Sequence, residues 1–472
     1  MGVSIQMTTA RLAALMFSAY VGIAMGAAPS QSEVSVPLDP YPSTYHPLPS
    51  TSFAIAHVTV LTGAGTRMDD ATVLIEHGNI TAVGERVAPP SSGVTVVDGT
   101  GKWLTPGLID VHSHMGAEAE PAVSAHDNIN EMTDPNTAGV WVEHSVWPQD
   151  PAFARALAGG VTTMQILPGS ANLFGGRSVI LKNVPATTVQ AMKFPGAPYG
   201  LKMACGENPD RVYGAEQKRA PMTRMGSFMG YRAAFIKAQA YQRKWDKYRE
   251  EVAAGKSPDP PERDLGLETL VGVLRGEILV HMHCYEADEM AEVIDLSREF
   301  GFHISAFHHA PEAYKIANLL AANHICAAIW ADWWGFKMEA YDGIRENLAM
   351  VESAGACAIV HSDSPIAIQH LNLAAAQAVA DGRRAGIDIA PEKAIRWITL
   401  NPARALGIGG RTGSIEVGKA ADVVLWGGDP FSVYTHAEQV YIDGALVYDR
   451  ADPAYQPLSD FELGQKAQRA LP

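Results

Sequence analysis

The chain has 472 residues, enough for two or three domains of ordinary size. With 36 Lys and Arg against 51 Asp and Glu, its formal net charge is −15, which argues against a protein that coats nucleic acid. Its 47% apolar and 18% charged residues exclude a disordered or collagen-like chain.

The first 28 residues have the pattern of a secretory signal peptide. Arg11 precedes the apolar run LAALMFSAYVGIAMGAA, which ends in small residues around Gly26 and Ala28. A membrane anchor is the alternative, although the run is barely long enough to span a bilayer. We therefore expect a secreted or periplasmic protein without stable membrane insertion after processing. Residues 29–51 are rich in Pro and Ser and are expected to form a linker.

Short strands with period-2 alternation are predicted at both ends of the chain. The first group is FAIAHVTVLTG, ATVLIEHGNITAVGE and GVTVVDGTGKWLTPG, and the second is GSIEVGKAADVVLWGGDP and AEQVYIDGALVYDR. We predict one small β-sandwich built from residues 52–103 and 412–450, with a large domain inserted between them. Residues 451–472 are expected to form a C-terminal tail.

The middle of the chain, residues 104–411, alternates short apolar strands with helical patterns. The eight candidate strands are GLIDVHSHM, GVTTMQILPG, SVILKNV, YGLKMACGEN, EILVHMHCY, FHISAFHHA, ICAAIWADWW and CAIVHSDSP. Buried strands that alternate with helices predict a parallel sheet of the α/β class, and eight units fit a (β/α)₈ TIM-like barrel. A doubly wound sheet is the alternative. A charged, solvated helical insertion is predicted around residues 211–264.

Histidines and a carboxylate collect at the ends of four of these strands. The pairs are His112 with His114, His281 with His283, His308 with His309, and His361 with Asp363. Side chains two residues apart in a strand share a face, so His112 and His114 can both point towards the barrel axis. Imidazole and carboxylate are ligands that Zn²⁺, Mn²⁺ and Fe²⁺ prefer, so the sequence predicts a metal centre at the barrel mouth.

Three segments together resemble the amidohydrolase superfamily of metal-dependent hydrolases, especially its imidazolonepropionase-like and prolidase-like branches. They are PGLIDVHSHMG, HSDSP and NPARALGIGGRTGSIEVGKAADVVLWGGDP, and the resemblance covers roughly residues 52–450. It implies a barrel with a terminal sandwich, and hydrolysis of amide or related C–N, ester or phosphoester bonds with one or two metal ions.

The resemblance also implies a set of metal ligands: His112, His114, His283, His309 and Asp363. The bridging carboxylate on the fourth strand has two candidates in GLKMACGENP. Lys202 would need to react with CO₂ to form a carbamate, whereas Glu207 ends the strand and needs no modification, so Glu207 is favoured. Either version implies two divalent ions, with Zn²⁺ expected.

The implied mechanism is attack on the scissile bond by metal-activated hydroxide. Asp363 would accept the proton on attack and deliver it to the leaving nitrogen. His281, one step deeper in its strand than His283, and His361 are expected to support the ligands or contact substrate.

The substrate contacts are expected around the end of the seventh strand. WADWWGFKMEAYDG would place an aromatic wall there with Lys337 as a carboxylate partner, and Arg177 and Arg211 are candidate anion contacts. The aromatic residues are Trp330, Trp333, Trp334, Phe336 and Tyr341. We expect a small-molecule or short-peptide substrate and no nucleic acid, and the sequence leaves the oligomeric state open, a homo-oligomer included.

The four cysteines, Cys205, Cys284, Cys326 and Cys357, show no CxxC spacing and lie in apolar segments. We expect buried free thiols.

Three interpretations compete with the small-molecule amidase. One is a dipeptidase or carboxypeptidase of the prolidase-like type. Another is a non-catalytic relative that uses the barrel as a scaffold, and the third is a nucleobase deaminase.

Overall fold

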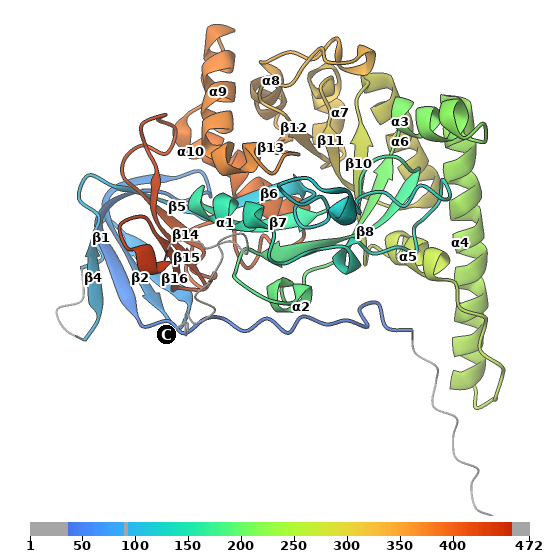
Figure 1. The fold of residues 1–472 in the computed structure, drawn as a ribbon, viewed down its shortest axis with the longest axis horizontal. Helices are drawn as coiled ribbons and strands as arrows, with labels where there is room; N and C mark the ends of the chain where they lie inside the picture. Colours follow the sequence, from blue (N-terminus) through green and yellow to red (C-terminus); the bar gives the residue numbers. More distant parts are fainter. Residues whose placement is uncertain (1–35, 89–92, 456–472) are drawn as a thin grey trace, which may run out of the picture.

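The computed structural model describes residues 36–88 and 93–455, which form two eight-stranded sheets (Figure 1). The predicted signal peptide lies outside the described residues, as does almost all of the predicted C-terminal tail. Within the described part, no helix is both long enough and apolar enough to cross a membrane.

One sheet combines strands from both ends of the chain, as the sequence predicts. Its order is β16-β15-β14-β5-β1-β2-β3, with β4 also pairing with β1. Its strands are β1 (Phe53–Leu61), β2 (Arg67–Glu76), β3 (Asn79–Gly84), β4 (Thr95–Asp98), β5 (Trp103–Pro106), β14 (Val423–Trp426), β15 (Ala437–Ile442) and β16 (Ala445–Asp449). The pairing of β5 with β14 is antiparallel and joins the two ends of the chain.

This terminal sheet is continuous and curls over its own core. The rings of Phe53 on β1 and Tyr441 on β15 stack with their centroids 4.8 Å apart, although two strands separate them in the sheet. In a flat sheet three strand spacings would place them about 14 Å apart. The turns at Gly78 and Gly444 also touch. The strands therefore form one curled sheet, where the sequence predicted a sandwich.

The second sheet is the barrel, with the order β13-β12-β11-β10-β9-β8-β7-β6. All eight segments predicted as strands form it: β6 (Leu108–Ser113), β7 (Val161–Ile166), β8 (Phe174–Lys182), β9 (Gly200–Ala204), β10 (Leu279–Cys284), β11 (Ile304–His309), β12 (Cys326–Ile329) and β13 (Cys357–Val360). Every residue of β6, β7, β9 and β11 is buried, as strands covered on both faces require. The Asp363 N–H donates to the His112 carbonyl across the remaining gap, so the barrel is nearly closed.

One barrel strand differs from the predicted parallel arrangement. β8 runs antiparallel to both β7 and β9. The connection from β7 to β8, residues 167–173, contains no helix. A parallel neighbour needs a crossover of about a dozen residues or more, so this short connection can only turn the chain back.

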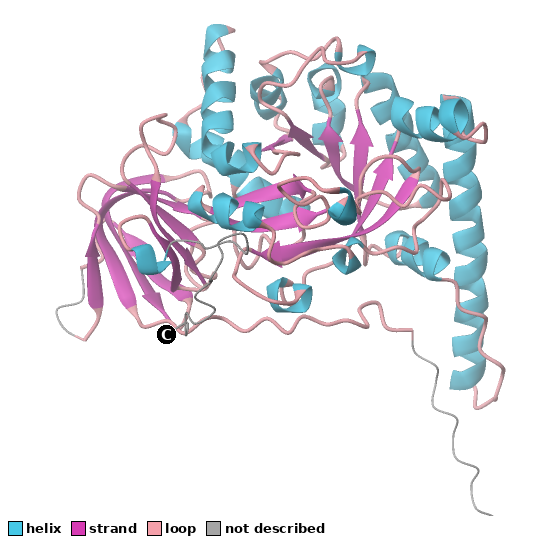
Figure 2. Cartoon of the chain, in the orientation of Figure 1, coloured by secondary structure: helices cyan, strands magenta, loops and turns pink. Residues whose placement is uncertain are grey.

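Helices cover the outside of the barrel (Figure 2). They are α1 (Pro151–Ala158), α2 (Val189–Met192), α3 (Glu207–Pro209), α4 (Arg224–Ala253), α5 (Leu265–Leu274), α6 (Ala287–Phe300), α7 (Ala317–Ala322), α8 (Asn347–Ser353), α9 (Leu371–Arg384), α10 (Pro391–Ala394) and α11 (Leu400–Ala405). The long helix α4 forms most of the region predicted as a helical insertion. It lies on the side of the barrel away from the terminal sheet (Figure 1).

Residues 36–51, the described part of the predicted linker, pack along the barrel. Arg177 Nη1 donates to the Leu38 carbonyl at 2.8 Å, and Lys193 Nζ donates to the Tyr41 carbonyl at 2.8 Å. The buried Tyr45 donates its hydroxyl proton to Asp443 in the terminal sheet. These contacts hold the segment against the barrel and the terminal sheet.

All four cysteines are paired, so the prediction of free thiols is wrong. Cys205 is bonded to Cys284, with the Cα atoms 5.2 Å apart, and Cys326 to Cys357, with the Cα atoms 4.4 Å apart. Each bond joins neighbouring strands: Cys326 and Cys357 lie opposite each other on β12 and β13. Partners 79 and 31 residues apart become neighbours only through the strand order, which cysteine spacing does not encode.

Candidate metal centre

Five of the residues predicted as ligands meet at the carboxyl end of the barrel strands. His112 belongs to β6, His283 to β10 and His309 to β11. His114 directly follows β6, and Asp363 lies three residues after the end of β13. All five line one cavity of about 360 Å³. The strand ends therefore bring together side chains up to 251 residues apart, from 112 to 363.

Asp363 is at the centre of this cluster. Its Oδ1 atom lies 3.4 Å from His112 Nε2 and 3.3 Å from His114 Nε2, and its Oδ2 atom lies 3.8 Å from His309 Nδ1. The two Nε2 atoms of His112 and His114 are 3.4 Å apart. The possible metal-ligand atoms of His112, His114 and Asp363 all lie within 4.8 Å of one another. The same is true of His112, His309 and His361.

Two residues of the cluster have left-handed backbone conformations. The φ angle is +70° at His309 and +52° at Asp363, which costs free energy in a residue with a side chain. Consecutive side chains of an extended strand point to opposite faces, so His308 and His309 could not both point inwards from a regular strand. The turn at His309 lets His308 contact His112 while His309 faces Asp363.

The ring nitrogens of the cluster suit a bound cation. His283 Nδ1, His309 Nδ1 and both nitrogens of His361 are buried, and none has a hydrogen-bond partner among the described residues. Burial lowers the pKa of His112, His283 and His309 well below the usual value, and that of His361 to about 4. Neutral imidazoles with free lone pairs beside a carboxylate are the donor set that Zn²⁺ prefers.

The two candidates for the bridging ligand lie in different places. The Lys202 side chain is buried inside the barrel, with its Nζ atom 3.4 Å from His112 Nε2. The Glu207 side chain is 43% exposed and pairs with Lys337, whose Nζ atom is 3.2 Å from Glu207 Oε1. Gly206, with φ of +76°, turns the chain before α3 and directs Glu207 to the rim. This placement favours Lys202 over Glu207.

The environment of Lys202 suits a reactive amine. Burial lowers the pKa of Lys202 to about 8, because the ammonium form loses its hydration and gains little from the nearby Asp363. A larger share of this amine is therefore neutral near physiological pH than of an exposed lysine. The neutral amine is the form that can react with CO₂.

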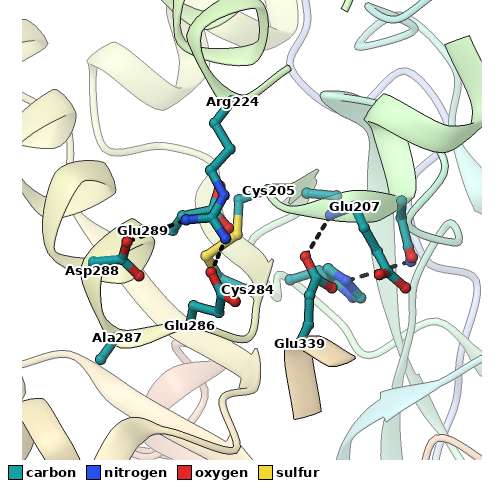
Figure 3. The surroundings of a disulfide bond; sticks show 12 residues. Cys205, Glu207, Arg224, Cys284, Glu286, Ala287, Asp288, Glu289 and Glu339 are labelled. Carbon is teal, nitrogen blue, oxygen red and sulfur yellow. Dashed lines mark hydrogen bonds and ion pairs between the residues drawn. A yellow bond between two sulfur atoms is a disulfide. The ribbon is translucent and has the colours of Figure 1, made fainter. Parts of the chain in front are cut away.

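The Cys205–Cys284 disulfide separates two charged groups at the rim (Figure 3). On one side Arg224 pairs with Glu286 and lies 3.5 Å from Glu289. On the other side the Glu207 N–H donates to Glu339, and Lys337 lies 2.9 Å from that carboxylate. Glu207 thus lines the same cavity as the histidines, but its side chain lies at the rim and pairs with Lys337.

An aromatic wall covers one side of the cavity, as predicted. Trp330 stacks on His309 with ring centroids 4.2 Å apart, and Trp333, Phe336 and Tyr285 also line the cavity. Lys337 Nζ sits 4.0 Å above the Tyr285 ring. Two of the five predicted aromatic residues do not line it: Trp334 packs under Arg345, and Tyr341 is 70% exposed.

The two predicted arginine contacts also differ in position. Arg211 lines the cavity and pairs with Glu216 at 2.6 Å. Arg177 is buried elsewhere: its guanidinium lies 4.2 Å from the Trp141 ring and donates to Thr269 at 2.7 Å. Arg177 lies within strand β8 and not in a loop, and it lines a different cavity from the one at the metal centre.

Sequence reasoning missed several residues around the site. Asp110 accepts hydrogen bonds from Ser362, next to Asp363, and from the His112 N–H at 3.0 Å. Burial raises the pKa of Asp110 to about 7. Asp110 and Tyr285 each lie two residues from a predicted ligand, His112 and His283, and this spacing could have identified them. Asn208 and Ser170 line the cavity without such a signal.

The chain resembles known hydrolases over most of its length. Residues 103–456 match the model of the Amidohydrolase family. The amidohydrolase tasK of Hapsidospora irregularis is 35% identical over 427 residues, which are 86% of this chain and 42% of that protein. The chain thus spans less than half the length of this relative. Imidazolonepropionase from Pseudomonas aeruginosa (strain UCBPP-PA14) is 25% identical, with 81% of this chain and 97% of that protein covered.

A solved structure has the same fold. An amidohydrolase from Thermotoga maritima MSB8 superposes with a TM-score of 0.77 at 37% identity, covering 84% of this chain and all of that chain.

Proposed function

The chain belongs to the Amidohydrolase family and is a hydrolase, and from this premise we propose that it cleaves an amide or peptide-like C–N bond at the histidine cluster. The observation that carries the proposal is the group of buried ring nitrogens near Asp363 that have no hydrogen-bond partner in the described part of the chain. Such groups are costly to bury unless something binds them. A non-catalytic scaffold would have no need to keep them.

We assign the metal ligands to the residues that the strand ends bring together. The residues that would hold two divalent ions, taken as Zn²⁺, are His112, His114, His283, His309 and Asp363, and Lys202 would add an anionic ligand once its amine has reacted with CO₂ to form a carbamate. Lys202 replaces Glu207 in this assignment because its Nζ atom reaches His112 Nε2 inside the barrel. When bound, such ions polarise a carbonyl and lower the pKa of water.

Residues of the chain itself would then transfer the proton of the attacking water. The Asp363 carboxylate is 19% exposed and faces the cavity, so it can accept a proton from the attacking water and pass it to the leaving nitrogen. Trp330 packs against His309 and shields that side of the cluster from solvent. Asp110 holds Ser362, so Asp363 keeps its left-handed conformation.

The cavity suits a small substrate. A volume of about 360 Å³ lies in the range of small-molecule sites, and its walls combine aromatic rings with charged groups. Trp333 and Phe336 would hold an apolar part of the substrate, while Lys337 and Arg211 offer cationic contacts at the rim. A dipeptide or an N-acyl amino acid has both features and is the substrate class proposed here.

Two experiments test this function. Elemental analysis of the purified chain should find close to two zinc ions per chain, and a panel of dipeptides, N-acyl amino acids and lactams should include a substrate. Dipeptide turnover alone would favour the prolidase-like alternative, and turnover of lactams alone would favour a cyclic-amide hydrolase. A chain without metal after purification and zinc reconstitution would contradict the proposal.

The mature protein is further proposed to lie outside the cytoplasm. Support comes from the signal-like leader and from two disulfides, which persist in oxidising compartments. N-terminal sequencing of protein from its native host should begin near residue 27–29. An intact leader on a cytoplasmic protein would refute the proposal.

A further inference from the structure

Behind the candidate metal centre lies a row of three buried histidines, which we call the histidine row: His112, His308 and His281. His308 Nδ1 is 2.8 Å from His112 Nδ1, and His308 Nε2 is 2.9 Å from His281 Nδ1. All three side chains are completely buried. The proposed function gives His112 a role as ligand and leaves His308 without one.

The row has few ways to arrange its protons. Each contact between two ring nitrogens needs one N–H donor and one lone pair. Three touching imidazoles in a dry site are neutral, since adjacent buried charges are very unfavourable, so each ring carries one N–H. His308 therefore donates either to His112 or to His281, and only two arrangements of the whole row satisfy both contacts.

The two arrangements differ at the metal centre. If His112 Nδ1 donates to His308, and His308 Nε2 donates to His281, then His112 Nε2 keeps a free lone pair. That atom faces Asp363 and Lys202, each at 3.4 Å, where a cation would be held. In the reverse arrangement the proton of His112 sits on Nε2 and points at the same place, where it would repel a cation.

The far end of the row is also fixed in position. A side chain at Gly200 would bring its Cβ atom within 2.8 Å of the His281 ring, so only glycine leaves room for this histidine. His281 Nε2 has no hydrogen-bond partner among the described residues. Among these contacts, only the one with His308 therefore decides which nitrogen of His281 carries its proton, and His281 Nδ1 can accept from His308.

We propose that His308 is a positioning residue, which accepts the Nδ1 proton of His112 and keeps His112 Nε2 available to a metal ion. The inference rests on the proposed function, because it needs a metal at His112. Metal-binding histidines commonly donate to a carboxylate or carbonyl, which can only accept. Here the acceptor is the His308 imidazole, which also carries an N–H group. That N–H group needs an acceptor of its own, and His281 Nδ1 provides it.

The test compares two substitutions of similar size at His308 in the full-length chain. In His308→Gln the side-chain oxygen can accept from His112 while the amide donates to His281, whereas His308→Leu can do neither. Zinc affinity is measured by competition with a coloured chelator. We expect His308→Leu to bind zinc roughly ten- to a hundredfold more weakly and His308→Gln to recover most of the loss.

A neighbouring substitution separates positioning from packing. Phe307→Leu changes the adjacent, buried residue of β11, which packs in the hydrophobic core. It should lower the melting temperature while zinc affinity stays at the wild-type value. If His308→Leu fails to fold, His281→Leu tests the other end of the histidine row. We expect this variant to lose less zinc affinity than His308→Leu would.

The possible results distinguish this inference from the proposed function. Wild-type protein that binds no zinc would contradict the proposed function. Wild-type protein that binds zinc, with His308→Leu equally tight or His308→Gln as weak as His308→Leu, would overturn the role of His308 alone. Unchanged affinity in a folded His281→Leu protein would overturn it too.

Discussion

Lys202 and His112 meet inside the barrel, where Lys202 Nζ lies 3.4 Å from His112 Nε2. They belong to β9 and β6, which two strands separate in the sheet order. The contact therefore crosses the barrel interior. A lysine placed there as an ammonium ion would repel bound cations at short range, so the proposed metal centre requires Lys202 in a neutral or anionic form.

The first prediction concerns metal content. Lys202→Met should lose about one zinc equivalent, because the anionic bridge is gone, whereas Glu207→Gln should keep both. Zinc per chain is counted by elemental analysis after gel filtration, with wild-type protein as the reference. In Lys202→Ala, zinc supplied with formate or acetate should restore part of the activity, since a small carboxylate can occupy the space. Full zinc content in Lys202→Met would show that the bridge lies elsewhere.

The second prediction is a pH dependence of reconstitution. Lys202 has a pKa of about 8 in the metal-free protein, and only its neutral amine reacts with CO₂. Below pH 8 the neutral fraction falls about tenfold per pH unit, so the initial rate of reactivation by zinc and bicarbonate should rise with pH up to about 8 and then level off. The rate is measured at a constant concentration of dissolved CO₂. A rate that does not change between pH 6.5 and 8.5 would contradict this.

The third prediction concerns proton transfer. Asp363→Asn should lower kcat/KM roughly 10²- to 10⁴-fold, because an amide cannot accept the proton from water. The folded structure should persist, which circular dichroism and the melting temperature check. Asp388→Asn, a change of an exposed residue paired with Arg383, is the matched control and should leave kcat/KM unchanged. Near-normal turnover by zinc-loaded Asp363→Asn would remove Asp363 from the mechanism.

The fourth prediction concerns the disulfides. Replacing Cys205 and Cys284 together by alanine should lower the free energy of unfolding by about 2–4 kcal/mol, since that bond closes a long loop. The equivalent change at Cys326 and Cys357 should cost less, because its loop spans 31 residues against 79. Denaturant titrations of the oxidised proteins give both values. Four reactive thiols in unreduced, denatured wild-type protein would show that the bonds do not form.

Much of the barrel follows from local pattern. Each barrel strand is a short apolar run, and the paired histidines mark the ends of β6, β10 and β11. Because the period of a strand is two, a pair such as His112 and His114 must share a face whatever the rest of the chain does. These local rules were enough to predict the histidine cluster and its position at the strand ends.

The remaining differences between the sequence analysis and the structure have non-local causes. The choice between Lys202 and Glu207 depends on where the chain turns at Gly206, and the sequence does not set that turn apart from a continued strand. The pairing of the cysteines depends on strand order. Because β8 runs antiparallel to β7, Arg177 does not lie at the end of the barrel that holds the histidine cluster. In the sequence, only the short connection before β8 indicates this reversal.

The pairing of β5 with β14 has a consequence for folding during synthesis of the chain. These partners, Trp103–Pro106 and Val423–Trp426, are separated by more than 300 residues of chain. At about 5–20 residues per second, a ribosome needs roughly 15–60 seconds to deliver the second partner after the first. Throughout that interval β5 exposes an unpaired edge, which can recruit foreign strands. A binding chaperone or delayed folding until export would protect the nascent chain.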